Sequence, residues 1–291
     1  MTSLARRRFI LVVAALAAMV LLGGCNVFRN ARRVQAEPPP PFQSPITTMV
    51  GHPGMSIPQI AEAIQPRQAD TRAILASLSV TVGQARSRTR MQFDASMYFA
   101  PPDFLRVRGS ADTGTLFDFL VHENHAQVMV VPEKKFYSGT QAALRNNPDL
   151  MAGIQPDDLM QSFLVEQNLY RHLTNPASNA SLRETKDHYL LTVSYATGVT
   201  EAYSLRMNDL LVDRIERSFG RRAMGSVRFD GYAFYTPEHS KTPHLLPTRF
   251  EAQLPSGAVA TVVAEEIQPN AKRQPALETI DVPPDYQRLP L

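Results

Sequence analysis

Hydrophobic and polar residues alternate along most of the chain, which is the pattern of strands that bury one face. In the clearest stretch, Met91, Phe93, Ala95, Met97 and Phe99 alternate with Gln92, Asp94, Ser96 and Tyr98. Successive side chains of a strand point to opposite faces, so this stretch predicts one apolar face, with Tyr98 on the opposite face. Further strands are predicted at about 78–84, 105–108, 115–121 and 126–131. Because their connections are short, we expect an antiparallel meander.

Helical periodicity replaces this alternation in two regions. Ile57, Ile60, Ala61 and Ile64 share one helix face, and Pro58 suits the first turn. A short helix or turn is predicted at 71–78, and helical material at about 140–170, including a helix that begins at Pro156.

Alternation then resumes and continues almost to the end of the chain. The predicted strands are 181–186, 189–195, 200–207, 211–219, 224–235, 246–254 and 258–268. The proline-rich tail after them is unsuited to a central strand. The chain is therefore predicted to be an α+β protein with a single antiparallel sheet of about eleven strands.

The N-terminus has the features of an exported lipoprotein. Three arginines at 6–8 precede an apolar run of 14 residues at 9–22. That run is shorter than the roughly 20 residues that span a bilayer core, but it suits a signal peptide. The sequence LGGC at 22–25 resembles the lipobox of bacterial lipoproteins, in which the cysteine is acylated and the chain is cut before it. Residues 1–24 are thus predicted to be a signal peptide and Cys25 to carry lipid; a plain secretory signal or a marginal membrane anchor is the alternative.

Charge and cysteine content narrow the functional classes. The whole chain has 30 Lys+Arg and 27 Asp+Glu, and residues 1–24 contain three arginines and no acid, so the remainder is close to neutral. Nucleic-acid-binding proteins usually carry a basic excess, so no nucleic-acid partner is expected. Cys25 is the single cysteine, which excludes disulfides within one chain.

Residues 25–56 are predicted to be a lipidated N-terminus and a Pro-rich tether. Four consecutive prolines at 38–41 favour an extended polyproline II segment. Arg29, Arg32 and Arg33 either attract anionic lipid, at about 1 kcal/mol each, or are simply solvated. Residues 57–291 are long enough for one sizeable domain.

The order of elements and several local segments resemble the LolA/LolB superfamily of bacterial lipoprotein carriers and sorting proteins. The segments are 102–107 (PDFLRV), 114–119 (GTLFDF), 131–139 (VPEKKFYSG) and 246–250 (LPTRF), and the resemblance covers about 57–282. It implies a strongly curved, half-open barrel with helices over a concave apolar face that receives acyl chains. Soluble LolA-like carriers lack lipidation, so Cys25 makes the chain more similar to LolB, an outer-membrane receptor. LolB also uses a protruding apolar loop residue, which has no clear counterpart here.

An acyl-chain site is predicted on the concave face of the first strands. Its candidate residues are Met91, Phe93, Met97, Phe99, Leu105, Val107, Phe117 and Phe119. The same residues also suit an ordinary core. The predicted helices look too small to cover the whole sheet, which favours a ligand on the uncovered part.

The resulting functional hypothesis is an envelope lipoprotein that binds lipid or lipoprotein acyl chains. A non-enzymatic structural lipoprotein that docks onto an envelope protein complex is the alternative. Asn26 follows the cysteine where an aspartate commonly retains enteric lipoproteins in the inner membrane, so the periplasmic side of the outer membrane is expected.

Enzymatic chemistry has little support in the sequence. His122 and His125 have a spacing that suits a metal, but a solvated hairpin turn accounts for them, and His239 and His244 fall in a Pro-rich loop. No Gly-x-Ser-x-Gly elbow, phosphate-binding loop or His-Glu-x-x-His motif is present. We therefore expect no enzyme activity, no metal and no cofactor.

The lipoprotein assignment is testable through the cysteine. Cys25→Ser should abolish incorporation of labelled palmitate and leave an uncleaved or mislocalised precursor, because the acyl acceptor is lost. Metabolic labelling followed by electrophoresis measures this. Equal labelling of the variant and the wild type would contradict the assignment.

Overall fold

The computed structural model describes residues 32–146, 156–176, 178–238 and 240–291. The predicted signal peptide and the predicted lipidation site, Cys25, lie outside these residues. Within the described ranges, no helix has both the length and the hydropathy needed to cross a bilayer.

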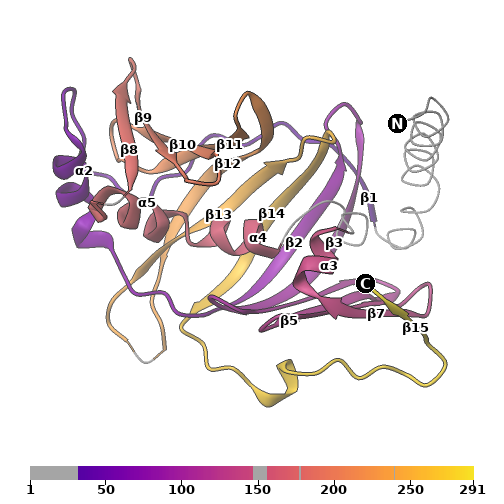
Figure 1. Cartoon of the computed structure of the whole chain (residues 1–291). Helices are drawn as coiled ribbons and strands as arrows, with labels where there is room; N and C mark the ends of the chain where they lie inside the picture. Colours follow the sequence, from indigo (N-terminus) through magenta and orange to yellow (C-terminus); the bar gives the residue numbers. More distant parts are fainter. Residues whose placement is uncertain (1–31, 147–155, 177, 239) are drawn as a thin grey trace.

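The described residues form one open, curved sheet of fifteen strands (Figure 1). The strands are β1 (Arg32–Gln35), β2 (Ile74–Gln84), β3 (Thr89–Ala100), β4 (Phe104–Ala111), β5 (Gly114–His122), β6 (His125–Val130), β7 (Lys135–Thr140), β8 (Asn179–Glu184), β9 (His188–Ser194), β10 (Val199–Arg206), β11 (Val212–Phe219), β12 (Arg222–Tyr235), β13 (His244–Gln253), β14 (Ala258–Pro269) and β15 (Gln287–Pro290). Their order is β15-β7-β6-β5-β4-β3-β2-β14-β13-β12-β11-β10-β9-β8, and β1 pairs with the start of β3. All neighbours are antiparallel except β15 and β7.

The sheet is larger than the sequence predicted. The expected count of about eleven was wrong, because β1, β7 and β15 were not recognised as strands. These three strands have four to six residues and no extended alternation, so they are recognisable only by their pairing with neighbouring strands. The segment at 71–78 was also misassigned as a helix or turn: β2 already begins at Ile74. The tail does avoid the sheet interior, as its prolines predicted, because β15 is an edge strand.

Five short helical segments cover the concave face or extend from it. They are α2 (Ile57–Ile64), the 3-10 helix η1 (Gln65–Arg67), α3 (Gln141–Arg145), α4 (Pro156–Phe163) and α5 (Val165–Thr174). Helix α2 has its predicted bounds, and Ile60 and Ile64 are fully buried. The helix expected from Pro156 ends at Phe163 and a second one follows it to Thr174. In Figure 1, α3, α4 and α5 lie on the inner side of the curved sheet.

The outer, convex face of β3–β7 is covered by the C-terminal tail. Ile280 and, in part, Leu277 and Val282 pack against a small apolar cluster that includes Tyr98 and Phe104. The tail contains the 3-10 helix η3 (Pro275–Leu277) and ends in β15. The tail buries apolar side chains that the strands would otherwise expose to water.

This covering changes the expected environment of Tyr98. Its side chain does point away from the concave face, as the alternation predicted. However, it is only 4% exposed, and its hydroxyl donates to the carbonyl oxygen of Ala271 at 3.2 Å. Tyr98 is therefore part of a second core and is not a solvated residue.

A buried ion pair fixes the tail to the convex face. Arg106 donates to both carboxylate oxygens of Asp118, from Nε at 3.0 Å and from Nη2 at 2.8 Å. Its remaining Nη1 donates to the carbonyl oxygen of Ala276 in the tail at 2.6 Å. Asp118 is fully buried and also accepts from Arg108 at 2.7 Å. Such pairs are stable only when all polar atoms find partners, and here the sheet and tail supply them together.

The described part of the predicted tether packs against the domain. The Phe42 ring lies 6.0 Å from that of Tyr232, with the Arg206 guanidinium 4.2 Å above it. The backbone of Gln43 bonds to Asp230 and Tyr232, at 2.9 and 3.0 Å. Residues 42–55 are therefore in contact with the sheet and do not form a free linker, contrary to what their proline content suggested.

Gly51 is required because the backbone of residues 42–55 approaches the β10–β11 turn closely. Val50 N–H donates to the carbonyl oxygen of Asn208 at 2.8 Å, which brings the next residue, Gly51, onto the β10–β11 turn. A Cβ at Gly51 would lie 2.0 Å from the carbonyl oxygen of Met207. Only glycine fits there.

The convex-face ion pair gives the first structural prediction. Asp118→Asn removes the charge that compensates the buried Arg106, so the free energy of unfolding should fall by about 3–5 kcal/mol. Urea denaturation followed by circular dichroism measures it. Asp285→Asn is the control, because it breaks an exposed pair with Lys134 and should leave the unfolding midpoint nearly unchanged. Equal midpoints for Asp118→Asn and wild type would contradict the assigned role.

Candidate functional site

The eight predicted acyl-site residues lie together on the concave face. All belong to one apolar cluster or pack against it. Met97, Phe99, Leu105 and Phe119 are at most 1% exposed, Phe93 and Val107 are buried, and Met91 and Phe117 are half-buried. Alternation thus assigned these side chains to the correct common face. Binding of an acyl chain to them stays a prediction, because in this structure other protein side chains fill the space in front of most of them.

A glycine makes room for the half-buried aromatic pair at one end of this face. The Phe117 ring meets the Phe93 ring edge-on, with centroids 5.6 Å apart. A Cβ at Gly109 would lie 2.2 Å from the Phe117 ring. The ring therefore occupies the space that a side chain on β4 would need.

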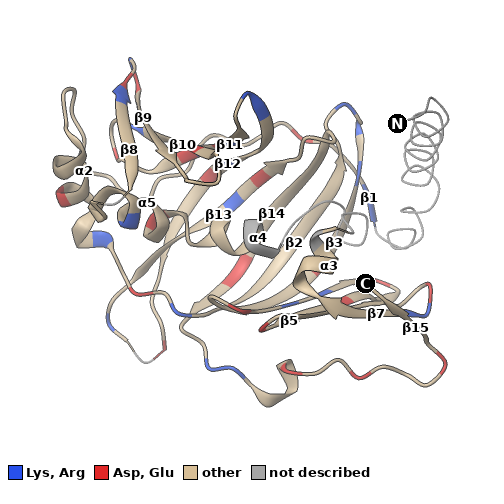
Figure 2. Ribbon diagram, viewed as in Figure 1, with Lys and Arg blue, Asp and Glu red and all other residues tan. Residues whose placement is uncertain are grey.

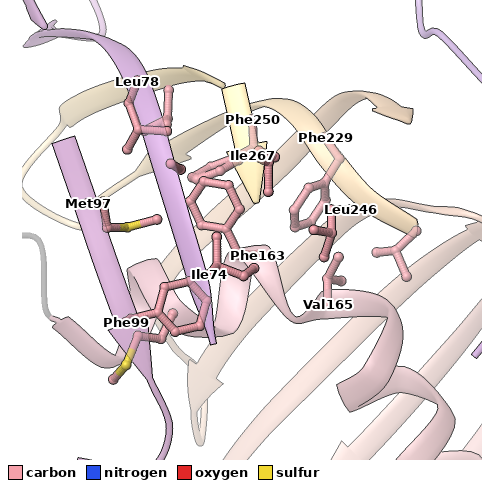
Figure 3. Close-up of a cluster of buried hydrophobic side chains, with 14 of the residues drawn as sticks. Ile74, Leu78, Met97, Phe99, Phe163, Val165, Phe229, Leu246, Phe250 and Ile267 are labelled. Atoms are coloured by element: carbon pink, nitrogen blue, oxygen red, sulfur yellow. The ribbon is translucent and has the colours of Figure 1, made fainter. Parts of the chain in front are cut away.

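The main filler of the concave face is Phe163, the last residue of α4. Its ring centroid lies 6.1 Å from that of Phe99 and 5.2 Å from that of Phe250. Figure 3 shows Phe163 between these two side chains, with Ile74 and Leu246 nearby. Phe163 is fully buried. One helix residue thus closes the space between β3 and β13.

A cleft remains beside Phe163, where α4 and α5 face β10–β13. It has a volume of about 70 Å³. Its apolar lining is Tyr203, Ile215, Met224, Val227, Ala252 and Leu254, and its polar lining includes Gln161, Asn168, Glu201 and Arg217. Pockets for small molecules usually measure roughly 300 Å³ or more. The cleft is therefore a partly closed space that a ligand of ordinary size does not fit without movement.

A buried carboxylate forms the polar wall of this cleft. Glu201 accepts hydrogen bonds from the hydroxyls of Tyr195 at 2.7 Å and Tyr203 at 3.0 Å, and from Arg217 Nε at 2.9 Å. Burial by itself would raise the pKa of Glu201, but the bonds from Tyr195, Arg217 and Tyr203 outweigh burial and hold that pKa below its ordinary value. Burial raises the pKa of both tyrosines, and their bonds to Glu201 raise it further. The wall is a charged, fully bonded group and not a free acid or base.

A second buried ion pair holds α5 in place. Arg67 in η1 donates to Glu166 Oε2 at 2.7 Å and to the carbonyl oxygens of Asp209 and Leu210 at 2.7 and 2.8 Å. The two charged side chains are 8% and 6% exposed. This clasp ties the helix pair to the β10–β11 turn, at the end of the sheet opposite the β11–β12 hairpin.

The cleft residues of β10–β12 were absent from the sequence-based site. Their strands were predicted, but aromatic content drew the site to β3–β5. One signal was available: Glu201 precedes Tyr203 and Leu205 on the inward face of β10, and a charge in that register marks an unusual environment.

The structure places the described histidines in separate parts of the sheet and its turns. His122 and His125 face each other across the two-residue turn between β5 and β6, as expected for a hairpin. His244 was misplaced in a loop, since it begins β13 and is buried against Thr71 at 2.7 Å. His239 lies outside the described residues. Within the described ranges, no three His, Cys, Asp or Glu side chains gather in a way that holds a metal.

Comparison with known proteins identifies the fold. No family model and no curated protein matches the chain. Among solved structures, a domain from Vibrio parahaemolyticus assigned to outer membrane lipoprotein sorting superposes with a TM-score of 0.51 at 10% identity. The match covers 76% of this chain and 97% of that domain.

Two further structures are similar at lower scores. A LolA superfamily protein from Nitrosomonas europaea has a TM-score of 0.46 at 9% identity, covering 76% of this chain and 96% of its own. A DUF1329 family protein from Desulfovibrio piger ATCC 29098 has a TM-score of 0.49 at 11% identity, covering 76% and 94%. The Vibrio domain therefore shows the fold of this chain, which is a single open, curved sheet.

Proposed function

We propose that this protein binds acyl chains of lipids or lipoproteins between its concave sheet face and the helix pair α4–α5. The observation that carries the proposal is the position of Phe163. A single aromatic side chain from a short helix fills the centre of an extended apolar face. In this proposal an acyl chain takes the place of Phe163, and the cleft beside it is where the chain begins to enter.

The helix pair suits a movable cover. Helices α4 and α5 have 8 and 10 residues, and helices this short are not stable alone in water. Their position therefore depends on tertiary contacts. Phe163 and Met160 are the buried apolar residues of α4, whereas α5 is held by Val165, Leu169 and Leu173 and by the Arg67–Glu166 clasp. Since the clasp holds α5, α4 is able to swing away while α5 keeps its place.

Replacing Phe163 by an acyl chain is favourable in free energy when the acyl chain is long. Removing Phe163 from the apolar face costs about 1.5–3 kcal/mol. Each acyl methylene buried in its place gains roughly 0.8 kcal/mol. About four buried methylenes offset the loss of Phe163, and further methylenes supply affinity. Short fatty acids are thus expected to bind poorly and long ones well.

The envelope setting follows from the N-terminus and from the fold. Lipid on Cys25 anchors the protein, and its proposed place is the periplasmic side of the outer membrane. The lipoprotein-sorting assignment of the Vibrio domain supports this setting. The polar wall around Glu201 is fully hydrogen-bonded, which supports binding without catalysis.

Truncating the filler should improve binding while weakening the fold. Phe163→Ala should lower the free energy of unfolding by about 3–5 kcal/mol. It should also raise the affinity for a fluorescent long-chain fatty acid about tenfold, because no ring has to be displaced. Fluorescence titration and urea denaturation measure the two effects.

A matched variant on the other face separates these effects. Phe104 is equally buried, but it lies in the convex-face cluster under the C-terminal tail. Phe104→Ala should destabilise the protein to a similar extent and leave fatty-acid affinity unchanged. If both variants, or neither, bind more tightly, the concave face is an ordinary core and the protein-docking alternative is favoured.

A charge in the cleft should have the opposite effect. Ile215 is half-buried and lines the cleft on β11. Ile215→Glu should reduce fatty-acid affinity at least tenfold, because an acyl chain cannot compensate a desolvated carboxylate. Ser96→Glu, at an exposed position on the convex face of β3, is the control and should bind normally. Normal binding by a folded Ile215→Glu protein would place the ligand elsewhere.

A further inference from the structure

Four segments that are distant in sequence meet at one end of the sheet. Strand β1 bonds to the β2–β3 hairpin, where Ala36 N–H donates to the carbonyl oxygen of Arg88 at 2.9 Å. That hairpin touches the β13–β14 turn through Ala85 N–H and the carbonyl oxygen of Gly257, also at 2.9 Å. The β11–β12 hairpin comes next, since Ser226 pairs with Gln253. We call these segments, 32–35, 84–89, 254–257 and 219–224, the basic rim.

The basic rim carries an excess of positive charge, with Glu37 as the acid that follows β1. Its six arginines are Arg32, Arg33, Arg86, Arg88, Arg221 and Arg222, all of them exposed. The four segments contain no Asp or Glu. None of the six makes an ion pair with another described residue. Glu216 and Glu251, nearby on β11 and β13, already pair with Arg214 at 2.8 Å and Arg90 at 3.0 Å. Figure 2 shows the blue segments at these hairpin tips and on β1.

The opposite end of the sheet has a different charge. Its hairpin turns carry the exposed acids Asp103, Glu123, Asp187 and Glu238 beside Lys186 and Lys241, and Asp70 and Glu278 pair there with Arg72 and Arg273. Positive charge also does not continue along the basic end, because the β4–β5 turn there carries Asp112. The excess is thus confined to the rim formed by β1–β3 and β11–β14, although the mature chain as a whole is near neutral.

Large apolar side chains stand among the arginines. Phe219 is 55% exposed and Met224 is 41% exposed, at the two ends of the β11–β12 hairpin tip. Both are among the few large apolar residues of the described chain that face water. Exposed aromatic and apolar side chains flanked by arginine are the composition that enters the headgroup boundary of a bilayer.

The rim also lies close to the proposed lipid anchor and to the cleft. Arg32 is the seventh residue after Cys25, so even a fully extended chain keeps Arg32 within about 25 Å of the acylated cysteine. Met224 and Leu254, at the hairpin and turn of the rim, line the cleft beside α4. A bilayer that meets the rim therefore also meets the entrance of the cleft.

We propose that the basic rim is a membrane-docking surface that rests on anionic phospholipid headgroups, with Phe219 and Met224 inserted between them. Docking turns the cleft entrance towards the bilayer, so an acyl chain passes between membrane and cleft without crossing water. The arginines attract the anionic headgroups over a distance, and this attraction weakens with salt. The two apolar side chains insert below the headgroups. The proposal that docking turns the cleft towards the bilayer rests on the proposed acyl-binding function. The proposal that the rim binds anionic membranes does not.

Hydrogen exchange on the lipidated protein tests the surface directly. The processed protein is placed on vesicles of phosphatidylcholine alone, or with about one third phosphatidylglycerol. On the anionic vesicles, turn amides at 85–88 and 220–223 should exchange at least about fivefold more slowly than on the neutral ones. High salt should remove part of the difference. Flotation with neutral vesicles reports the lipid anchor separately.

Two charge-matched variants decide the assignment. Replacing Arg86, Arg88, Arg221 and Arg222 by Gln should abolish the protection on anionic vesicles. Replacing Arg183, Lys186, Lys241 and Arg288 by Gln removes the same charge from exposed positions elsewhere and should keep it. Absent protection in the wild type, or equal loss in both variants, would overturn the proposal, as would protection that appears only with an added envelope protein. Fatty-acid titration of the rim variant in solution should be normal, so a failure of docking is distinguishable from a failure of acyl binding.

Discussion

An open sheet of fifteen strands has to cover two apolar faces with very little helix, and this constraint shapes the molecule. On the concave side, α2, α4 and α5 supply the cover, and Phe163 is its centre. On the convex side, the described residues supply no helix longer than one turn, and the C-terminal tail lies across β3–β7. Each cover is joined to the sheet by a buried arginine: Arg67 bonds to α5 and Arg106 to the tail.

The two covers differ in what they allow. The tail is held by Arg106, by the Ile280 cluster and by the pairing of β15 with β7, so it behaves as a permanent part of the domain. The concave cover is held by buried side chains of α2, α4 and α5, with Phe163 at its centre, and by the Arg67–Glu166 pair. It leaves a cleft of about 70 Å³ beside it. A surface that is closed by a replaceable side chain is suited to a ligand that is itself a flexible hydrocarbon. This difference connects the architecture to acyl binding.

Charged residues are distributed unevenly between the interior of the protein and the two ends of the sheet. Glu201, Asp118 and Glu166 are buried and paired, whereas the arginines of the basic rim face water and pair with no acid among the described residues. The buried pairs position strands and helices. The rim arginines lie at the end of the sheet where β1 pairs with β3 and where the cleft opens. The proposed lipid on Cys25, the basic rim and the cleft entrance thus fall on one side, which is the side proposed to face the bilayer.

Local pattern was sufficient for much of the fold. Alternation in 91–99 placed Phe93, Met97 and Phe99 on one face, because strand geometry alone decides which side chains share a side. It also identified the long strands, and periodicity identified α2 with its bounds. The short strands β1, β7 and β15 were not identified by alternation, because they are defined by their pairing with neighbouring strands. The tail over Tyr98, the packing of Phe42 and the filling of the concave face by Phe163 also required the tertiary structure. These contacts join segments that are far apart in the chain. Local sequence pattern does not indicate which face of the sheet a distant segment covers.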